Sequence, residues 1–529
     1  MIKNKSLGYQ FKYLVFACCF GLACFQTLSE ELQSSIQKLV NQVGTEFEVP
    51  GIAVGIVKQN KVIHLKGYGV ADILTKKAVD EDTLYKIASN TKAFTSAALA
   101  ILVEQGKLNW DDKVIKYLPN FKMYDPWVTQ EFNIRDLLTH RSGLRIGAGD
   151  LMLWPEPTKF TRTEVIENLR YLKPVASFRD EYAYDNLLYI VAGEVVAKIS
   201  GISWEAFIQS NIFKPLEMSS CFAGGVPKVN AHNIASPHAT VEGNLVVLDK
   251  YKIVEQTSLM AAAGGIKCSL NDLTKWVQFQ LKQGQLEDGK RLFSSQIASE
   301  LWKPVTTLPI SDSMRQLDKT SYRAYALGWR ISDYHGVRRV SHTGTLSGFM
   351  SQIILFPEQE IGIVLLTNQQ SGEARDVLAK GLSQLLLHDI PYTDWVEVYK
   401  NKIVQKTKVK KNKRNEATQE LKIANNKQST QRFGRFEDAW FGFVRIEKDK
   451  NSIRFNSEKS PRMTGEIFQN KSGRWWVKWD DRSFEADAWL DFESTINDGK
   501  TLLTMKPILS TTDFSFNFED LYFTKVENN

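Results

Sequence analysis

Residues 89–106 read as a helix that carries a hydroxyl and an amine on one face. Ser89 and Lys92 are three residues apart, a spacing that places both side chains on the same side of a helix. The residues that follow are apolar at helical spacing, namely Phe94, Ala97, Ala98, Ile101 and Leu102, and Gly106 is a suitable C-terminal stop. The pattern predicts a buried or amphipathic helix with Ser89 near its N-terminus, where the helix dipole favours developing negative charge.

This serine and this lysine have the chemistry of a nucleophile and its activator. A serine hydroxyl needs a neighbouring base at neutral pH, and a partly desolvated lysine can supply one when its pKa is lowered. The S-x-x-K spacing is weak evidence by itself, because ordinary composition produces it about once in 250 residues. Read alone, Ser89 and Lys92 are interpreted as an ordinary solvated or packed helix start.

Two later segments favour a catalytic role for Ser89 and Lys92. Tyr184–Asn186 precedes a helical run that ends at Ser200-Gly201, and by itself it could be a helix cap. His342–Thr345 ends a short apolar strand, and by itself it could be a strand end with a glycine turn. Taken in order, S-x-x-K, Y-x-N and H-T-G are related to the motif set of class A β-lactamases and penicillin-binding proteins.

The chain resembles the serine β-lactamase and penicillin-binding protein superfamily, in its class C-like branch. Further segments fit the pattern over about residues 35 to 390: Pro50–Val57 with Gly67–Ala71, Ile134–Leu144, Ala263–Ile266 with Asp272-Leu273, and Phe349–Asn368. The resemblance implies an α/β (α+β) domain, in which an antiparallel sheet is flanked by helices and faces an all-helical lobe at roughly residues 95 to 260. The hairpin 54–70 and the strands within 329–367 are expected to build that sheet.

The resemblance also implies roles for individual residues. Ser89 would attack a carbonyl and form an acyl-enzyme, and Lys92 and Tyr184 would share the proton transfers. Which of these two is the general base stays open. Asn186 would bind the acyl side chain of the substrate or orient Lys92, and the backbone NH groups of Ser89 and Thr345 would form the oxyanion hole. The substrate-binding set is therefore Asn186, His342, Thr343, Gly344 and Thr345.

Position 342 departs from the β-lactamase form of the motif. Those enzymes usually have a lysine there, whereas His342 is mostly neutral at pH 7 and holds a substrate carboxylate less well. The family members with HTG are more like D,D-peptidases, D-aminopeptidases and esterases, so weak β-lactamase activity is the lesser alternative. Gly344 is expected because a ligand that approaches a strand backbone leaves no room for a Cβ atom.

Other residues that could act as a nucleophile or bind a metal fit those roles poorly. Ser142 lies in His140–Gly143 without a G-x-S-x-G elbow, so we interpret it as a structural loop serine. The seven histidines show no metal-ligand spacing, and we predict no metal and no cofactor. A Ser-His-Asp triad remains an alternative, because its members can be far apart in sequence.

The N-terminus has the pattern of a secretory signal, predicted as residues 1–23. Lys3, Lys5 and Lys12 precede an apolar run of 13 residues from Tyr13 to Phe25, which is short of the roughly 20 that a transmembrane helix needs. We expect an exported, periplasmic or extracellular protein. A lipoprotein anchor at Cys24 and an uncleaved signal anchor are the alternatives. Export permits a disulfide, but whether Cys221 and Cys268 pair stays open.

Composition changes after the predicted hydrolase domain, residues 30–395. Within the predicted linker 396–430, residues 402–427 contain nine basic and two acidic side chains, an excess equal to the net charge of +7 of the whole chain. This segment could contact anionic lipid or wall polymer, but a solvated linker is the favoured interpretation. Membrane contact is expected only here or at the N-terminal segment, and nothing resembles a nucleic-acid module.

Residues 431–527 are predicted to form a small antiparallel β domain, sheet or barrel. Aromatic and aliphatic residues alternate with polar ones in short segments, and the period of two continues through Phe514, Phe516 and Phe518 before it shifts at Leu521. The segment resembles a domain of unknown function often found behind these hydrolases. Its aromatics are expected to be core, with a lipocalin-like pocket as the alternative.

The favoured function is an exported serine hydrolase that forms an acyl-enzyme on Ser89 with an amide or ester. The substrate is expected to be a small molecule or peptide, such as a D-amino peptide, a lactam or a short ester. The alternative is a penicillin-binding or wall-binding receptor with little turnover. The natural substrate and the oligomeric state stay open.

Overall fold

The computed structural model describes residues 30–249, 252–254, 258–405, 418, 420–423, 431–450, 452–494 and 501–526. The predicted signal segment and most of the predicted basic linker lie outside these residues. In the described part of the chain, no single helix is long and apolar enough to cross a membrane.

The central element is an antiparallel sheet built from both ends of the first domain. Its strands run in the order β2 (Lys61–Gly69), β1 (Gly51–Lys58), β13 (Ile361–Thr367), β12 (Phe349–Phe356), β11 (Val337–Leu346), β10 (Arg330–Tyr334), β9 (Arg323–Tyr325) and β8 (Thr306–Thr307). Ile52 pairs with Thr367, which joins the early hairpin to the late strands. Every residue of β12 and β13 is buried, because helices cover both faces.

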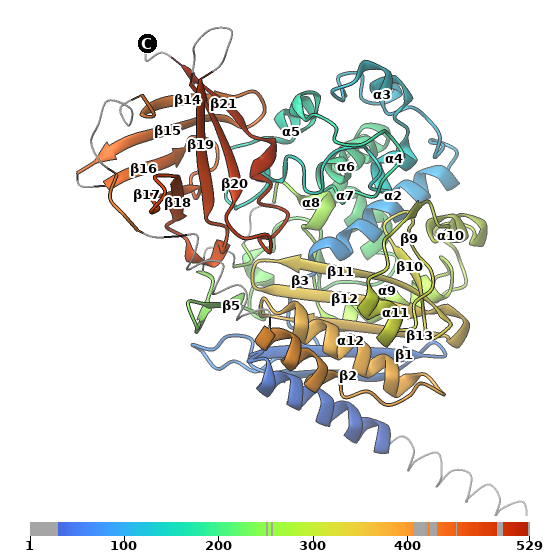
Figure 1. Cartoon of the computed structure of the whole chain (residues 1–529). Helices are drawn as coiled ribbons and strands as arrows, with labels where there is room; N and C mark the ends of the chain where they lie inside the picture. The colour runs from blue at the N-terminus through green and yellow to red at the C-terminus, as the bar shows by residue number, and fades with distance from the viewer. Residues whose placement is uncertain are drawn as a thin grey trace, which may run out of the picture.

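One face of the sheet is covered by the ends of the domain. The helices at residues 30–46 and 395–405 lie with α12 (Gly372–Leu386) against this face (Figure 1). The opposite face packs on α9 (Leu270–Leu281) and on the helical lobe. Two separate hydrophobic cores result, one on each side of the sheet.

The helical lobe surrounds one central helix, α2 (Thr91–Glu104), whose residues 91–102 are all buried. It contacts α6 (Leu187–Ser200) and α8 (Ala261–Gly264) most closely. The lobe also contains α3 (Pro126–Glu131), α4 (Ile134–Leu138), α5 (Arg162–Asn168) and α7 (Trp204–Ile208), which has a π-helical extension to Phe213. The helix α10 (Ser295–Leu301) contacts α2, whereas α11 (Asp312–Leu317) packs through Leu317 on the core beneath α12. The fold predicted for this domain is confirmed.

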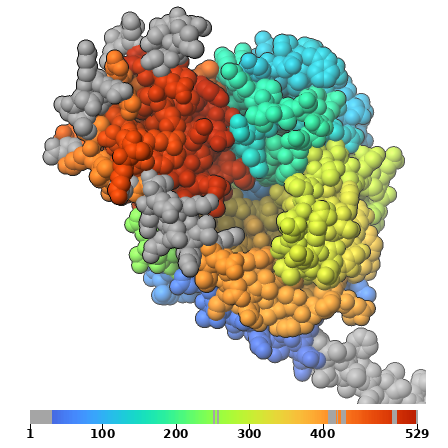
Figure 2. Space-filling view, viewed as in Figure 1, coloured from blue at the N-terminus to red at the C-terminus, as the bar shows by residue number. Residues whose placement is uncertain are grey.

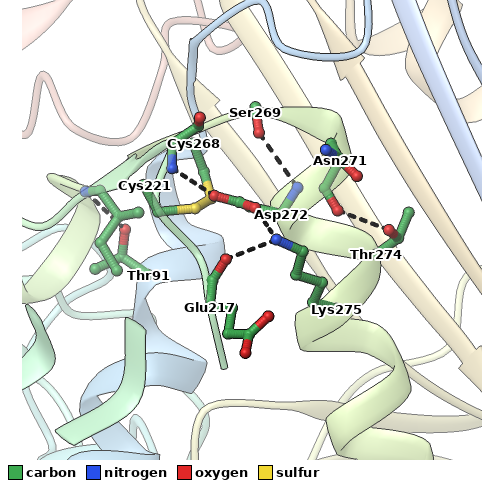
Figure 3. Close-up of a disulfide and its surroundings, with 11 residues drawn as sticks. Thr91, Glu217, Cys221, Cys268, Ser269, Asn271, Asp272, Thr274 and Lys275 are labelled. Carbon is green, nitrogen blue, oxygen red and sulfur yellow. Dashed lines mark hydrogen bonds and ion pairs between the residues drawn. A yellow bond between two sulfur atoms is a disulfide. The ribbon is translucent and has the colours of Figure 1, made fainter. Parts of the chain in front are cut away.

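A small sheet connects the two halves of the domain beside Ser89. It consists of β3 (Tyr85–Lys86), β7 (Lys267–Cys268) and β4 (Cys221–Phe222), and a hairpin of β5 (His238–Val241) and β6 (Asn244–Val247) lies apart from it. Cys221 and Cys268 are fully buried cross-strand partners and form a disulfide (Figure 3). Asp272 holds the neighbouring turn by accepting from the Ser220 amide at 2.6 Å. The structure therefore pairs Cys221 with Cys268, which the sequence left open.

The second domain is a closed antiparallel barrel. Its strands follow chain order: β14 (Gly434–Asp438), β15 (Gly442–Asp449), β16 (Ser452–Ser457), β17 (Thr464–Gln469), β18 (Trp475–Trp479), β19 (Ala488–Ser494), β20 (Thr501–Pro507) and β21 (Tyr522–Val526). Inward-facing residues, among them Phe436, Phe455, Trp475 and Trp479, are buried and form the core. The expected β domain is confirmed.

One predicted strand of the second domain is wrong. Phe514, Phe516 and Phe518 do not form a strand but lie in the loop and short 3₁₀ turn between β20 and β21. Phe516 and Phe518 are buried and pack on each other, while Phe514 extends toward the first domain. The alternation arises because the loop faces two surfaces, the barrel interior and the first domain.

Candidate active site

Ser89 lies in a tight turn between β3 and α2. The preceding residue, Ala88, has a backbone φ angle of 49°, which residues other than glycine rarely adopt. The turn is held from β12, where the Ser351 hydroxyl donates to the carbonyl oxygen of Ile87 at 2.6 Å and accepts from the side-chain Nδ2 of Asn90 at 2.7 Å. Strained backbone of this kind persists only where its surroundings impose it, and it places the partly exposed Ser89 at the start of the buried helix.

Lys92 lies directly below this serine and is fully buried. Its Nζ is 3.4 Å from Ser89 Oγ, and it donates to Asn186 Oδ1 at 2.7 Å and to the carbonyl oxygen of Ala263 at 2.9 Å. Burial lowers the pKa of Lys92 to about 7, although two nearby carboxylates oppose the shift. A large fraction of Lys92 is therefore neutral near pH 7 and able to accept a proton.

Tyr184 lies on the other side of the serine. Its ring is 4.8 Å from Lys92 Nζ, and its hydroxyl interacts with Ser89. Burial raises the pKa of Tyr184 above its usual value, and the interactions with Ser89 and Arg330 only partly oppose this. The side chain is therefore a neutral phenol at physiological pH, which can donate a proton.

Asn186 connects Lys92 to a carboxylate that the sequence did not reveal as a site residue. Its Nδ2 donates to Asp150 Oδ2 at 2.8 Å, while its Oδ1 accepts from Lys92. Asp150 is 1% exposed, and burial together with the charge of Asp185 raises its pKa well above the usual value. No motif in the sequence marks Asp150 as a site residue.

His342 is held inside the protein rather than in the cavity wall. Nδ1 donates to the carbonyl oxygen of Thr343 at 2.7 Å, so Nε2 accepts from the Tyr325 hydroxyl at 2.8 Å. The ring is 1% exposed, and burial and the nearby Arg330 hold its pKa well below the usual value. Both ring nitrogens are thus used internally, and direct substrate binding by His342 stays a prediction.

Arg330 supplies a positive charge near this histidine, which the sequence did not indicate. Its guanidinium donates to Thr343 Oγ1 at 3.2 Å and lies over the rings of Tyr184 and Tyr325 at 5.8 Å and 5.7 Å. Arginine stacked on aromatic rings in this way remains charged. Arg330 thus places a fixed positive charge beside Tyr184 and Thr343 from the neighbouring strand β10.

Gly344 has a different physical reason from the expected one. A Cβ atom there would be 2.2 Å from the carbonyl oxygen of Ile87 and 2.2 Å from Ser351 Oγ. The glycine thus allows strand β11 to pass against the turn that carries Ser89, rather than making room for a ligand. Thr345, one residue further, lines the same cavity as Ser89.

Two other residues weighed from the sequence are also accounted for. Ser142 is buried and its hydroxyl accepts from the Leu144 amide at 3.3 Å, as a structural loop serine would. His140 is fully buried behind Tyr184, with its ring centroid 4.3 Å away, and its Nδ1 accepts from the Asp185 amide at 3.0 Å. The groups that contact the Ser89 hydroxyl are Lys92 and Tyr184.

A cavity of about 760 Å³, its open mouth included, lies over Ser89. From the first domain it is lined by Ser89, Asp150, Trp154, Asn186, Met260, Gly264 and Thr345, among others. From the barrel it is lined by Ser483, Phe484, Asp513, Ser515 and Phe516. The second domain thus forms part of the cavity wall.

Comparison with known proteins agrees with this geometry. The sequence model of a family described as Beta-lactamase matches residues 36–387, and one described as Domain of unknown function (DUF3471) matches residues 419–525. The chain is 27% identical over 368 residues to Protein flp of Staphylococcus aureus (strain N315), covering 68% of each protein. It is 26% identical over 362 residues to Unguisins hydrolase ungD of Aspergillus violaceofuscus (strain CBS 115571), covering 64% of this chain and 62% of that one.

A solved structure shares the fold of both domains. It is described as the octameric penicillin-binding protein homologue from Pyrococcus abyssi, and it matches with a TM-score of 0.60 at 22% identity. The match covers 93% of this chain and 99% of that one. At this identity, the likeness concerns the fold alone.

Proposed function

The chain belongs to the beta-lactamase family of serine hydrolases, and from that premise we propose that Ser89 forms an acyl-enzyme with an amide or ester substrate. One observation carries the proposal: Lys92 Nζ lies 3.4 Å from Ser89 Oγ and has a pKa of about 7. A neutral amine at hydrogen-bonding distance is the base that a serine nucleophile requires.

The two proton-transfer residues take different roles in this proposal. Neutral Lys92 accepts the proton as Ser89 Oγ attacks the substrate carbonyl carbon. Tyr184, held as a phenol by burial, donates its proton to the leaving group and is reprotonated through Lys92. Water then attacks the acyl-enzyme by the reverse sequence. Backbone NH groups of Ser89 and Thr345 donate hydrogen bonds to the carbonyl oxygen as it becomes negatively charged.

The proposed substrates are D-amino peptides or short esters, with lactams as poor substrates. Neutral His342 supports this choice, since no lysine holds a lactam carboxylate at that position. The relative ungD is by its name a hydrolase of unguisins, which supports hydrolysis as the reaction of this chain.

We also propose export to the periplasm or the extracellular space. The apolar N-terminal run supports it, and so does the buried Cys221–Cys268 disulfide, since disulfides persist mainly in oxidising compartments. The mass of the mature protein, purified from cells, tests this proposal. A chain that begins near residue 24 supports export with cleavage, and an intact N-terminus on cytosolic protein contradicts it.

A fluorophosphonate probe tests the catalytic proposal. We expect labelling of the wild-type protein and of Ser142→Ala, a control at the buried loop serine, and none of Ser89→Ala. Labelling that persists in Ser89→Ala would contradict the assignment. Stable labelling by penicillin without ester turnover would instead support a receptor.

A further inference from the structure

Two lysines lie buried side by side in the small sheet next to Ser89. Lys86 of β3 pairs directly with Lys267 of β7, so both side chains lie on the same face of this sheet, with their Cβ atoms about 5 Å apart. Lys86 is 8% exposed and Lys267 is 4% exposed. Lysine is almost never buried to this extent unless an opposite charge accompanies it. Neither lysine takes part in the proposed hydrolysis.

The two ammonium groups have no ion pair inside the described protein. Lys267 Nζ donates to the carbonyl oxygen of Gly224 at 2.8 Å, whereas Lys86 has no hydrogen bond or ion pair with any residue that the structure describes. Burial lowers the pKa of Lys86, and it lowers the pKa of Lys267 to about 8, a shift to which the charge of Lys86 adds. Two adjacent cations that have lost most of their water repel each other, and an anion between them would offset both costs.

The two carboxylates that act on these lysines are bonded to other residues. Glu156 acts on both lysines and Glu205 acts on Lys267, but over distances longer than an ion pair. A carboxylate oxygen of Glu156 accepts from the Ser258 hydroxyl, and Glu205 is paired with Arg162. The positive charge of the two lysines is therefore only partly compensated.

The loop that carries Glu156 is held by the barrel. Arg462 donates to the carbonyl oxygen of Glu156 at 2.7 Å, and the Lys159 amide donates to the carbonyl oxygen of Lys459 at 2.8 Å. Figure 2 shows the barrel, in red and orange, in direct contact with the helical lobe, in cyan and green. The fixed backbone favours the observed contact of the Glu156 carboxylate with Ser258 over an ion pair with the lysines.

We propose that Lys86 and Lys267 form a binding site for a small oxyanion, a carboxylate or a phosphate group, outside the cavity over Ser89. Neither lysine lines that cavity, but Lys86 lies two residues before Ala88, which does. The anion would join β3, which leads into the Ser89 turn, to β7. This inference goes beyond the proposed hydrolysis and does not depend on it.

Thermal unfolding of the full-length protein tests the site. Sodium acetate and sodium phosphate, compared at equal ionic strength, distinguish a carboxylate ligand from a phosphate ligand. We expect at least one of them to raise the wild-type Tm along a saturable curve, by about 2 °C or more at about 10 times the dissociation constant. Lys86→Met should abolish this rise, because it removes the ammonium that lacks a partner. No rise with either anion, or an equal rise in Lys86→Met, would overturn the proposal.

Two further variants separate binding from an effect on folding. Lys107→Met, at an exposed lysine outside the cluster, is the matched control and should keep the wild-type rise in Tm. Glu156→Gln removes the carboxylate that acts on both lysines, so the rise should occur at a lower anion concentration than in the wild type. A rise that needs more anion in Glu156→Gln would contradict the two lysines as the partners of the anion.

The bound anion should also affect Ser89. The Ile87 amide donates to the carbonyl oxygen of Ile266 at 3.0 Å, and each of these residues is next in the chain to one of the two lysines. An anion held by both lysines would strengthen this link, so it should speed fluorophosphonate labelling of the wild type and not of Lys86→Met. An unchanged wild-type rate would contradict the link to Ser89. Absence of any labelling would contradict the proposed function and leave the result from Tm as the test of the site.

Discussion

The ring of Phe514 stands edge-on to the ring of Tyr184, with their centroids 5.7 Å apart. Phe514 belongs to the barrel and is 38% exposed, whereas Tyr184 belongs to the helical lobe and is 6% exposed. The barrel loop thus covers one side of the proposed proton donor and helps to keep it away from water.

Replacement of Phe514 by alanine tests this cover. Phe514→Ala should lower kcat/KM for a short ester about 2-fold to 10-fold, the equivalent of the roughly 0.5–1.5 kcal/mol that an aromatic pair contributes. Tyr392→Ala, at a ring that is 83% exposed, is the control and should not change the rate. An unchanged rate in Phe514→Ala would show that the contact is irrelevant to the reaction.

Gly344→Ala should disable the site through packing. The added Cβ would lie 2.2 Å from the carbonyl oxygen of Ile87, which belongs to the turn that carries Ser89. Overpacking of this kind costs about 1–3 kcal/mol, and we expect a lower Tm together with loss of fluorophosphonate labelling. Gly44→Ala is the matched control, since its Cβ would make only ordinary contacts, the nearest at 3.7 Å, in a helix that favours alanine.

The fold could be predicted because its signals are local and repeated. The buried helix behind Ser89 and the apolar strands 349–367 carry their periodicity in neighbouring residues. The loop at Phe514–Phe518 was misread because a period of two also arises where a loop alternates between two packing surfaces. Local pattern cannot separate these cases.

The site was predictable only where a motif marks it. Ser89, Lys92 and Tyr184 come together as expected, because short motifs carry them. Asp150 and Arg330 were missed, since their roles depend on which strand or loop packs beside them. The expected reason for Gly344 failed similarly: its neighbour is the distant backbone of Ile87.

The pH dependence of acylation should follow Lys92. The side chain must be neutral to accept the proton, so kcat/KM should rise with pH through a midpoint near 7, where its pKa lies. Lys92→Arg cannot become neutral in this range and should lose activity by about 100-fold or more. An activity that falls as pH rises from 6 to 8 would contradict the role of Lys92 as base.

The lowered pKa of Lys92 should also make the free energy of unfolding depend on pH. Its pKa is about 7 in the folded protein and about 10.5 when unfolded, so the unfolded chain binds more protons between these values. The contribution of Lys92 to the free energy of unfolding should therefore rise with pH across that window. In urea denaturation, the gain in the free energy of unfolding of Lys92→Met over the wild type should be largest near pH 6 and smaller near pH 9. The opposite trend would contradict the lowered pKa.

Reduction of the disulfide should destabilise the first domain. Cys221 and Cys268 are 47 residues apart, and a crosslink over such a loop contributes about 2–4 kcal/mol. The Cys221→Ser, Cys268→Ser double variant should show a lower Tm than the oxidised wild type, measured by differential scanning fluorimetry. Reductant should lower the Tm of the wild type only, and an equal effect on the double variant would argue against the pairing.

The central claim is that turnover passes through a covalent intermediate on Ser89. Acid quenching of the wild-type protein during hydrolysis of a short p-nitrophenyl ester, followed by peptide mapping by mass spectrometry, tests it most directly. The account predicts one acyl group on the peptide that contains Ser89, at the oxygen that lies 3.4 Å from Lys92 Nζ. An acyl group on another residue of the cavity would contradict it.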